Sequence, residues 1–234
     1  MNPRHLLTLA ALPEGAARAI LDEAHRRKAA RAGRPRGAPD ADMALAGHHL
    51  AMIFEKPSTR TRVSFEMAMR QLGGAASVLT AADLQLGRGE TVADTARVMG
   101  RYVDAVMLRA KAHASLEAFA ANAGVPVING LTDRCHPCQA LADVMTAEER
   151  LGRPIAGTRW AWVGDGNNMA RSLAEAAAAL GFTLAVAAPE GWDGGLATTG
   201  DPAQAVSGAD VVATDVWFSM GDADDSAKRA ALAR

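Results

Sequence analysis

The sequence contains little cysteine, few aromatic side chains and almost no lysine. Two cysteines, Cys135 and Cys138, are too few for a disulfide framework. With only 5 Phe, 4 Trp and 1 Tyr against 53 alanines, the core must be built largely from small side chains. No apolar run approaches the roughly 18 residues of a membrane-spanning helix, and the first residues are too charged for a signal peptide. We therefore expect a soluble, cytoplasmic protein that does not bind membranes.

The chain also has no excess of positive charge. Its 25 Lys and Arg residues oppose 26 Asp and Glu residues, which gives a net charge of −1. Non-specific binding of nucleic acid requires a marked basic excess that displaces counterions, so we expect no nucleic-acid partner. Arginine nevertheless supplies 21 of the basic residues. Because the planar guanidinium grips carboxylate and phosphate well, a small anionic substrate fits this composition.

Short apolar runs alternate with segments of helical periodicity, which predicts an α/β fold. A helix over residues 5–30 is followed by expected strands at 50–54, 75–79, 105–108 and 125–128, with helices between them. A turn-rich stretch at 150–154 precedes further strands at 160–163, 184–188 and 211–213. Nearly continuous apolar strands of this kind indicate parallel sheets that are covered on both faces. We predict two doubly wound parallel-sheet domains, over residues 1–148 and 149–234.

The first polar loop, residues 55–62, reads Glu-Lys-Pro-Ser-Thr-Arg-Thr-Arg and joins a strand to a helix. Hydroxyls, backbone N–H groups and guanidinium groups at a helix N-terminus can cradle a phosphate. Alternatively, Ser58 merely caps the helix. Arginines in a first turn oppose the helix dipole, so capping alone explains the pattern less well.

Two further sites follow predicted strands. Arg109 follows the strand at 105–108, and the stretch from Asn129 to Gln139 contains His136-Pro137-Cys138-Gln139. A neutral imidazole and an amide at a helix start can both donate hydrogen bonds to a carbonyl oxygen. Two alternatives stay open, because a lone histidine is often structural and Cys135-His-Pro-Cys138 also matches a Cys-x-x-Cys redox motif.

In the second half, residues 163–168 (Val-Gly-Asp-Gly-Asn-Asn) resemble the start of a dinucleotide fingerprint, but Met169 stands where its third glycine belongs. Paired asparagines suit a zwitterionic amino acid instead. Asp215 follows the last strand and could hold an ammonium group or simply cap a turn. The remaining histidines considered, His48, His49 and His113, sit apart from any carboxylate or thiol cluster, so no metal site is expected.

Seven elements occur together: Ser58-Thr-Arg-Thr-Arg62, Gln85-Leu-Gly-Arg-Gly-Glu90, Asp94-Thr-Ala-Arg97, Arg109, His136-Pro-Cys-Gln139, Gly164-Asp-Gly-Asn-Asn168 and Asp215 with Ser219-Met-Gly221. In this order they resemble the ornithine carbamoyltransferases over nearly the whole chain. The Ser-Thr-Arg-Thr and His-Pro-x-Gln elements are shared by carbamoyltransferases generally and imply carbamoyl phosphate. The Asp-Gly-Asn-Asn and Ser-Met-Gly elements are similar to the ornithine branch.

The resemblance assigns roles to individual residues. It implies that phosphate is held by Ser58, Thr59, Arg60 and Thr61, and the carbamoyl group by Arg109, His136 and Gln139, with Pro137 and Cys138 in the same motif. Gln85 would reach a neighbouring subunit's site in a homotrimer. Ornithine would be bound by Asn168, Asp215, Ser219 and Met220. The catalytic groups would be Arg60, Arg109, His136 and Gln139.

The implied reaction is attack of the side-chain amine of L-ornithine on carbamoyl phosphate, which gives citrulline and phosphate in arginine metabolism, without metal or cofactor. The family's later His-Cys-Leu-Pro loop has no counterpart before Arg234, and the stretch from 189 to 209 looks short. The resemblance therefore implies a C-terminal truncation and an incomplete second domain. Two alternatives follow: a catalytically impaired fragment that still binds carbamoyl phosphate, or a carbamoyltransferase with another amine acceptor.

Overall fold

The structure is a computed structural model of the chain, and it describes residues 5–80, 82–84 and 89–216. Strands and helices alternate along the chain, as the sequence predicts. They form two compact units. The first comprises the residues up to Leu12 together with Ala19–Cys138, and the second comprises Pro13–Arg18 together with the residues from Gln139 onward. The predicted domain boundary after residue 148 stays a prediction.

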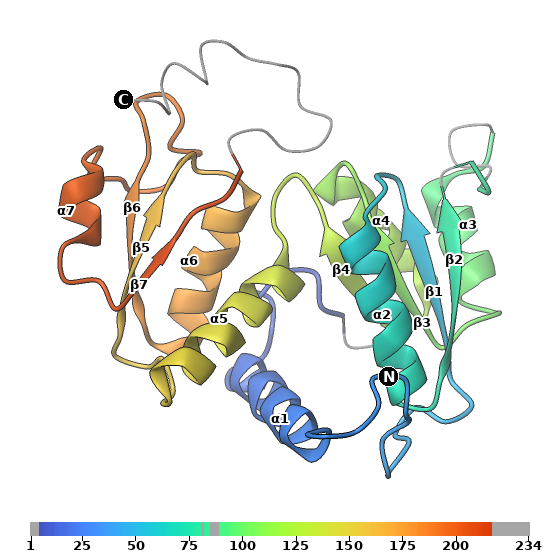
Figure 1. Cartoon of the computed structure of the whole chain (residues 1–234). Helices are drawn as coiled ribbons and strands as arrows, with labels where there is room; N and C mark the ends of the chain where they lie inside the picture. Colours follow the sequence, from blue (N-terminus) through green and yellow to red (C-terminus); the bar gives the residue numbers. More distant parts are fainter. Residues whose placement is uncertain (1–4, 81, 85–88, 217–234) are drawn as a thin grey trace. The chain divides into compact units, whose positions relative to one another are not determined.

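The first unit is built on a parallel sheet with the strand order β2-β1-β3-β4. Its strands are β1 (His49–Phe54), β2 (Ala75–Thr80), β3 (Ala105–Arg109) and β4 (Val127–Leu131). The crossover helices are α2 (Thr59–Gln71), α3 (Val92–Met99) and α4 (His113–Ala123). Because the chain moves from β1 outward to β2 and then returns to β3, helices come to lie on both faces of the sheet (Figure 1). The predicted doubly wound fold is confirmed.

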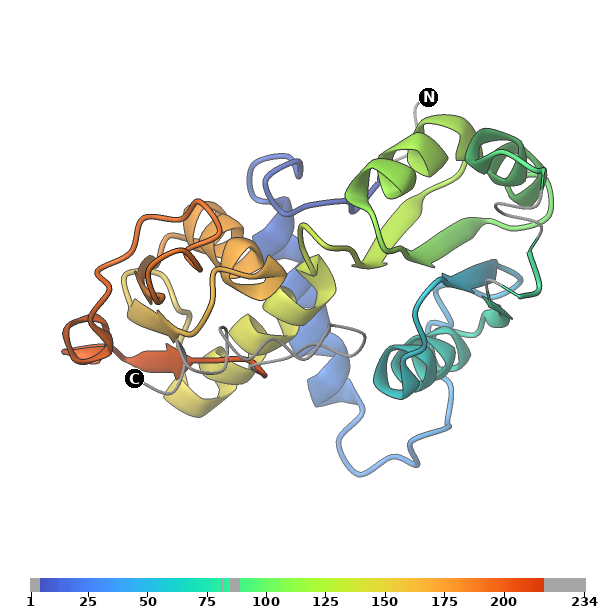
Figure 2. The ribbon, with the colours of Figure 1, turned by 90° about the horizontal axis from the view of Figure 1, so that it is seen from above.

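Alternating side chains of the strands build two separate cores. On one face, Met52 and Phe54 of β1 pack with Met69 of α2. On the other, Ile53 packs with Leu116 and Phe119 of α4 in a cluster that also includes α3. Figure 2 shows α2 on the opposite side of this sheet from α3 and α4. Burial on both faces explains why the strands lack alternating polar residues.

The N-terminal segment differs from the prediction of one helix over residues 5–30. Helix α1 spans only Ala16–Ala30, because Pro13 and Gly15, which has a φ of +74°, interrupt the helical pattern. The preceding residues extend along β4 instead. Leu6 donates its N–H to the Val127 carbonyl at 2.9 Å and forms an isolated parallel bridge with Ile128.

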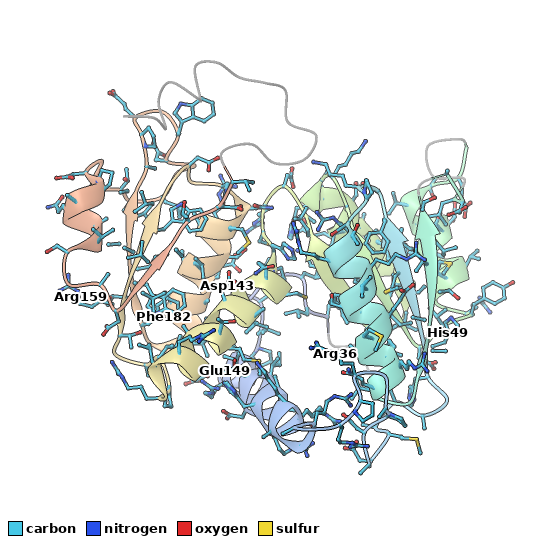
Figure 3. The ribbon with its side chains drawn as sticks, in the orientation of Figure 1. Arg36, His49, Asp143, Glu149, Arg159 and Phe182 are labelled. Atoms are coloured by element: carbon cyan, nitrogen blue, oxygen red, sulfur yellow. The ribbon has the colours of Figure 1, made fainter. Side chains whose placement is uncertain are left out.

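The second unit has a smaller parallel sheet with the order β6-β5-β7. Its strands are β5 (Arg159–Val163), β6 (Thr183–Ala187) and β7 (Val211–Ala213), and its helices are α5 (Pro137–Leu151), α6 (Asn168–Leu180) and α7 (Pro202–Val206). Trp160 is buried and its ring lies 4.7 Å from that of Phe182, which is labelled in Figure 3. Ala161 packs with Ala205 of α7. Small side chains thus fill much of this core, as the alanine content predicts.

Helices α1 and α5 each contain residues of both units. They have 15 residues each. In the part of the chain that the structure describes, no helix has the length and apolar character needed to cross a membrane.

Candidate active site

The N-terminus of α2 presents polar groups at the carboxyl end of β1. Ser58 is the N-cap: its Oγ accepts a hydrogen bond from the Thr61 N–H at 3.3 Å and donates one to Thr61 Oγ1 at 3.0 Å. Thr59 and Arg60 follow in the exposed first turn, which contains no acidic residue. The first N–H groups of a helix lack intrahelical partners and carry partial positive charge. An arginine added at that end makes the site strongly attractive to an anion.

Arg109 lies beside this helix start, because it is the last residue of β3 and pairs in register with Phe54, the last residue of β1. Its side chain is buried, with 9% exposed. Nη1 donates to Thr61 Oγ1 and to the Gly130 carbonyl, both at a long 3.5 Å, and within the described residues Nε has no hydrogen-bond partner.

The pKa of Arg109 is lowered by burial and by the positive charge of Arg60. Among the described residues the hydrogen-bond partners of Arg109 are Thr61 and Gly130 and not a carboxylate, so the fold holds a buried cation next to a second one. Such an arrangement is costly unless something negatively charged binds there. The two guanidinium groups therefore indicate a site for an anion.

His136 immediately precedes α5 and belongs to the same group. Burial lowers its pKa to about 4, with a further contribution from the charge of Arg109. The imidazole is therefore neutral at neutral pH and can donate a hydrogen bond without carrying charge. A neutral imidazole is what the predicted role of a donor to a carbonyl oxygen requires, and that role stays a prediction.

The two cysteines do not have the properties of a redox pair. Burial and the neighbouring Cys135 raise the pKa of Cys138 to about 12. Its thiol donates to the Asn129 carbonyl at 3.5 Å, while Cys135 is fully buried and donates to the Leu7 carbonyl at 3.4 Å. Because redox chemistry at a Cys-x-x-Cys motif requires a stabilised thiolate, the structure argues against that alternative.

Asn129 is a structural residue of the site that sequence reasoning did not single out. It was expected in a loop but lies in β4, fully buried. Its Nδ2 donates to the Leu7 carbonyl at 2.8 Å, and its Oδ1 accepts from the Leu131 N–H at 2.9 Å. The side chain thus ties the N-terminal segment to the strand end that leads to His136. An asparagine within an apolar run was the signal that could have revealed it.

In the second unit, the loop between β5 and α6 is organised by Asn167. Its Oδ1 accepts hydrogen bonds from the Met169 and Ala170 N–H groups, at 2.8 and 3.1 Å. A Cβ on Gly166 would lie 1.9 Å from the Asp193 carbonyl oxygen, so this glycine permits a close approach of two chain segments. A dinucleotide needs those N–H groups and that space for its pyrophosphate. The structure therefore disfavours the dinucleotide interpretation.

Four polar side chains of the second unit interact with one another: Asn167, Asp215, Gln139 and Asp143. Asn167 Nδ2 donates to Asp215 Oδ2 at 3.2 Å. Gln139 Nε2 donates to Asp143 Oδ1 at 2.7 Å, and Asp143 projects from α5 (Figure 3). The pKa of Asp143 is raised by burial and by the negative charge of Asp215, against the opposing effect of the Gln139 hydrogen bond. Asp143 was not among the predicted site residues, whereas Asn167 is one of the paired asparagines that the sequence indicates for an amino acid.

The structure places the predicted residues as follows. In the first unit it brings together Ser58, Thr59, Arg60, Thr61, Arg109 and His136, with Pro137 and Cys138 opening α5. In the second unit Gln139 lies in the first turn of α5, Asn168 is the first residue of α6 and Asp215 follows β7. Gln85, Ser219 and Met220 lie outside the described residues. Within the described ranges, no group of three or more His, Cys, Asp or Glu side chains could hold a metal ion.

Comparison with known proteins gives consistent matches over nearly the whole chain. The sequence model "Aspartate/ornithine carbamoyltransferase, carbamoyl-P binding domain" matches residues 4–149, and the corresponding "Asp/Orn binding domain" model matches residues 156–234. The ornithine carbamoyltransferase of Rhizorhabdus wittichii is 54% identical over 98% of this chain and 78% of its own length. That of Caulobacter vibrioides is also 54% identical, over 99% of this chain and 78% of its own length.

Solved structures agree with these matches. The chain resembles the ornithine carbamoyltransferase of Pyrococcus furiosus with a TM-score of 0.87 and 48% identity, over 98% of this chain and 77% of that one. It resembles that of Thermus thermophilus with a TM-score of 0.83 and 39% identity, over 93% of this chain and 76% of that one.

Proposed function

Because the chain belongs to the aspartate/ornithine carbamoyltransferase family, we propose that it transfers the carbamoyl group of carbamoyl phosphate to the side-chain amine of L-ornithine, giving L-citrulline and phosphate. The family models and the relatives confirm the family membership that the motifs predict. The protein is therefore a carbamoyltransferase. The observation that carries the proposal is the buried Arg109 beside Arg60 and a neutral His136. Two relatives that are named ornithine carbamoyltransferase and are 54% identical to this chain support ornithine as the acceptor.

In this proposal the N-terminus of α2 holds the phosphate of the donor. The phosphate would be bound by the hydroxyls of Ser58 and Thr61, which lie 3.0 Å apart, by the first-turn N–H groups at Thr59 and by the guanidinium of Arg60. Phosphate carries the charge that this cationic site lacks. As the bond to the carbamoyl carbon breaks, Arg60 offsets the charge that builds up on the leaving phosphate.

Arg109 and His136 act on the carbamoyl group. The amine nitrogen of ornithine attacks the carbonyl carbon, and the resulting tetrahedral intermediate places negative charge on the carbonyl oxygen. Arg109, held as a cation, and His136, held neutral by a pKa of about 4, both donate hydrogen bonds to that oxygen. Loss of one such donor typically lowers kcat by about 10²- to 10³-fold. The intermediate collapses by breaking the C–O bond to phosphate, and the nitrogen loses its proton, for which the departing phosphate is an acceptor.

Gln139, Asn168 and Asp215 orient the rest of the reactants. The carboxylate of Asp215, held by Asn167, attracts an ammonium group of ornithine. This charge also favours the protonated amine, so a proton must leave before attack. Ser219 and Met220 would complete the acceptor site, and Gln85 would act on a neighbouring subunit's site in a homotrimer. Arginine synthesis in the cytoplasm is part of the same proposal.

Acceptor competition tests this function. The protein, incubated with carbamoyl phosphate, should form citrulline from ornithine and little product from aspartate or putrescine. Product from putrescine instead would support the alternative acceptor. Carbamoyl phosphate binding by calorimetry without turnover would support the impaired fragment, and absence of both binding and turnover would refute the proposal. Light scattering tests the trimer, which requires three times the chain mass of 24.3 kDa.

A further inference from the structure

We propose that His113 is a positioning residue that sets the direction of His136 by holding the segment that leads to it. The inference deepens the proposed function and rests on it, because His136 acts there as a hydrogen-bond donor to the carbonyl oxygen of carbamoyl phosphate. The segment, here called the connector, comprises residues 132–135 and joins the end of β4 to His136, the residue before α5. His113, the connector and His136 all belong to the first unit.

Thr132 holds the connector through the backbone of Cys135. The Thr132 N–H donates to the Cys135 carbonyl at 3.0 Å, and Thr132 Oγ1 accepts a hydrogen bond from the Cys135 N–H at 3.3 Å. Both side chains are fully buried. Asn129 Nδ2 adds a longer contact to the Cys135 carbonyl, at 3.4 Å. Because His136 follows Cys135 directly, its direction depends on where the Thr132 hydroxyl is held.

His113, the first residue of α4, holds that hydroxyl. Its side chain is buried, and Nδ1 lies 2.9 Å from Thr132 Oγ1. The hydroxyl lies farther from the Cys135 carbonyl, at 3.4 Å, so its hydrogen points to Nδ1. Nε2 lies 3.5 Å from Glu117 Oε1. Because a carboxylate only accepts, this contact favours the tautomer of the neutral ring with its proton on Nε2, which leaves Nδ1 as the acceptor for Thr132.

A second contact joins the start of α4 to the connector. Asp133 Oδ1 accepts a hydrogen bond from the His113 N–H at 2.9 Å, and the Asp133 N–H donates to the Lys111 carbonyl at 3.2 Å. The N-cap residue Ala112 makes no side-chain hydrogen bond to the helix, so the connector supplies the cap. His113 was expected to sit apart from any thiol, yet Cys135 Sγ lies 3.9 Å from its Nδ1. The fold thus joins the start of α4 and the connector in one hydrogen-bonded cluster.

A packing role alone would favour a different side chain at this position. A buried imidazole takes polar nitrogens out of water, whereas leucine fills a similar space without that cost. If His113 only stabilised the fold, its loss would lower activity by the same factor whether or not His136 is present. A positioning role acts through His136, so the effect must disappear once His136 has been replaced.

A double-mutant cycle separates these roles. His113→Leu removes the acceptor, and His113→Asn keeps one, because its Oδ1 can accept at the place of Nδ1. Each variant is made in the wild-type and in the His136→Asn background. The rate constant kcat for citrulline formation is measured together with the Kd of inorganic phosphate, which the proposed function places at α2. His48→Leu is the matched control, because His48 is an exposed histidine of the same unit.

The expected result is a loss of kcat that depends on His136. His113→Leu lowers kcat about 10- to 100-fold, the range expected when a reacting group is misplaced by up to about 1 Å. His113→Asn restores most of this loss. In the His136→Asn background, His113→Leu changes kcat by less than about twofold, the usual limit of additivity. The Kd of phosphate stays unchanged throughout, and His48→Leu changes neither quantity.

Two kinetic results overturn the proposal and leave the proposed function intact. The first is an equal loss of kcat in both backgrounds, and the second is a His113→Asn variant as impaired as His113→Leu. Should His113→Leu fail to fold, Thr132→Val removes the same hydroxyl contact and must show the same dependence on His136.

The NMR signals of the His136 ring test the positioning without any turnover. A wild type that forms no citrulline refutes the proposed function, and these signals then decide about His113 separately. Both His113 variants lack the imidazole and have nearly equal size, so they differ in the acceptor. The His136 ring signals must therefore lie near their wild-type positions in His113→Asn and be displaced in His113→Leu. Identical signals in the two variants refute the positioning role.

Discussion

Replacing Arg109 by methionine should make the ligand-free protein more stable and its donor binding much weaker. Methionine keeps most of the length and bulk of the side chain and removes its charge. Arg109 is 9% exposed, sits beside Arg60 and has an Nε without a hydrogen-bond partner among the described residues. Since none of the residues that the structure describes neutralises this desolvated cation, we expect a bound anion to do so.

The two effects can be estimated from the contacts. Arg109 gives up two hydrogen bonds of 3.5 Å, to Thr61 and Gly130, which together contribute about 1 kcal/mol at that length. Exchange of a buried charged group for an apolar side chain commonly gains about 1–4 kcal/mol. The net result is a stabilisation of up to about 3 kcal/mol. With ligand, the loss of charge-assisted hydrogen bonds costs about 3 kcal/mol, or roughly 150-fold in Kd.

Urea unfolding without ligand and calorimetry with carbamoyl phosphate measure these opposite effects on the same variant. Arg101→Met is the control, because Arg101 is exposed and its replacement should change neither quantity. A ligand-free Arg109→Met protein that is less stable than the wild type would show that Arg109 supports the fold, and the reasoning about a preformed anion site would be wrong.

Three further predictions concern residues around this site. The His136 imidazole should titrate near pH 4 in NMR spectra instead of near 6.5. Because the pKa is lower in the folded state, unfolding takes up a proton between these values, so stability should rise with pH across that window and His136→Asn should remove this rise. A signal that titrates near 6.5 would refute the burial argument. Cys138, with a pKa of about 12, should resist a thiol reagent at pH 8 until the protein unfolds; fast labelling of the native protein would contradict this. Asn129→Leu keeps the branched outline of the side chain but leaves the Leu7 carbonyl and the Leu131 N–H without their partner, which should cost about 2–4 kcal/mol in urea unfolding. A cost below about 1 kcal/mol would show that water or relaxation replaces these bonds.

The sequence predicted the elements that local pattern controls. Strands such as β1 and β3 are short apolar runs with no competing signal, and the parallel order follows from helices between them. The N-terminal helix was overextended because the helical periodicity before Pro13 hides a segment that pairs with β4. That pairing depends on residues more than 100 positions apart, which no local pattern records.

The residues of the candidate site likewise include some that the sequence reveals and some that it does not. Ser58 and Arg109 were identifiable because they stand at strand and helix ends, where ligands bind in such folds. Asp143 could not be identified from the sequence. The hydrogen bond from Gln139 and the negative charge of Asp215 act on it only because α5 and the end of β7 belong to one folded unit. Asn129 was missed for a related reason. Its amide connects the N-terminal segment to β4 through the hydrogen bond to the Leu7 carbonyl, and this contact depends on the full burial of the side chain, which the sequence position does not show.

Transfer of the carbamoyl carbon itself tests the central claim most directly. The protein is mixed with ¹³C-carbamoyl phosphate and equal concentrations of ornithine and aspartate, and the label is followed by NMR. The account predicts that the signal moves from carbamoyl phosphate to the ureido carbon of citrulline, faster than in a sample without protein. Transfer of the label to aspartate, or loss of the label only at the uncatalysed rate, would contradict it.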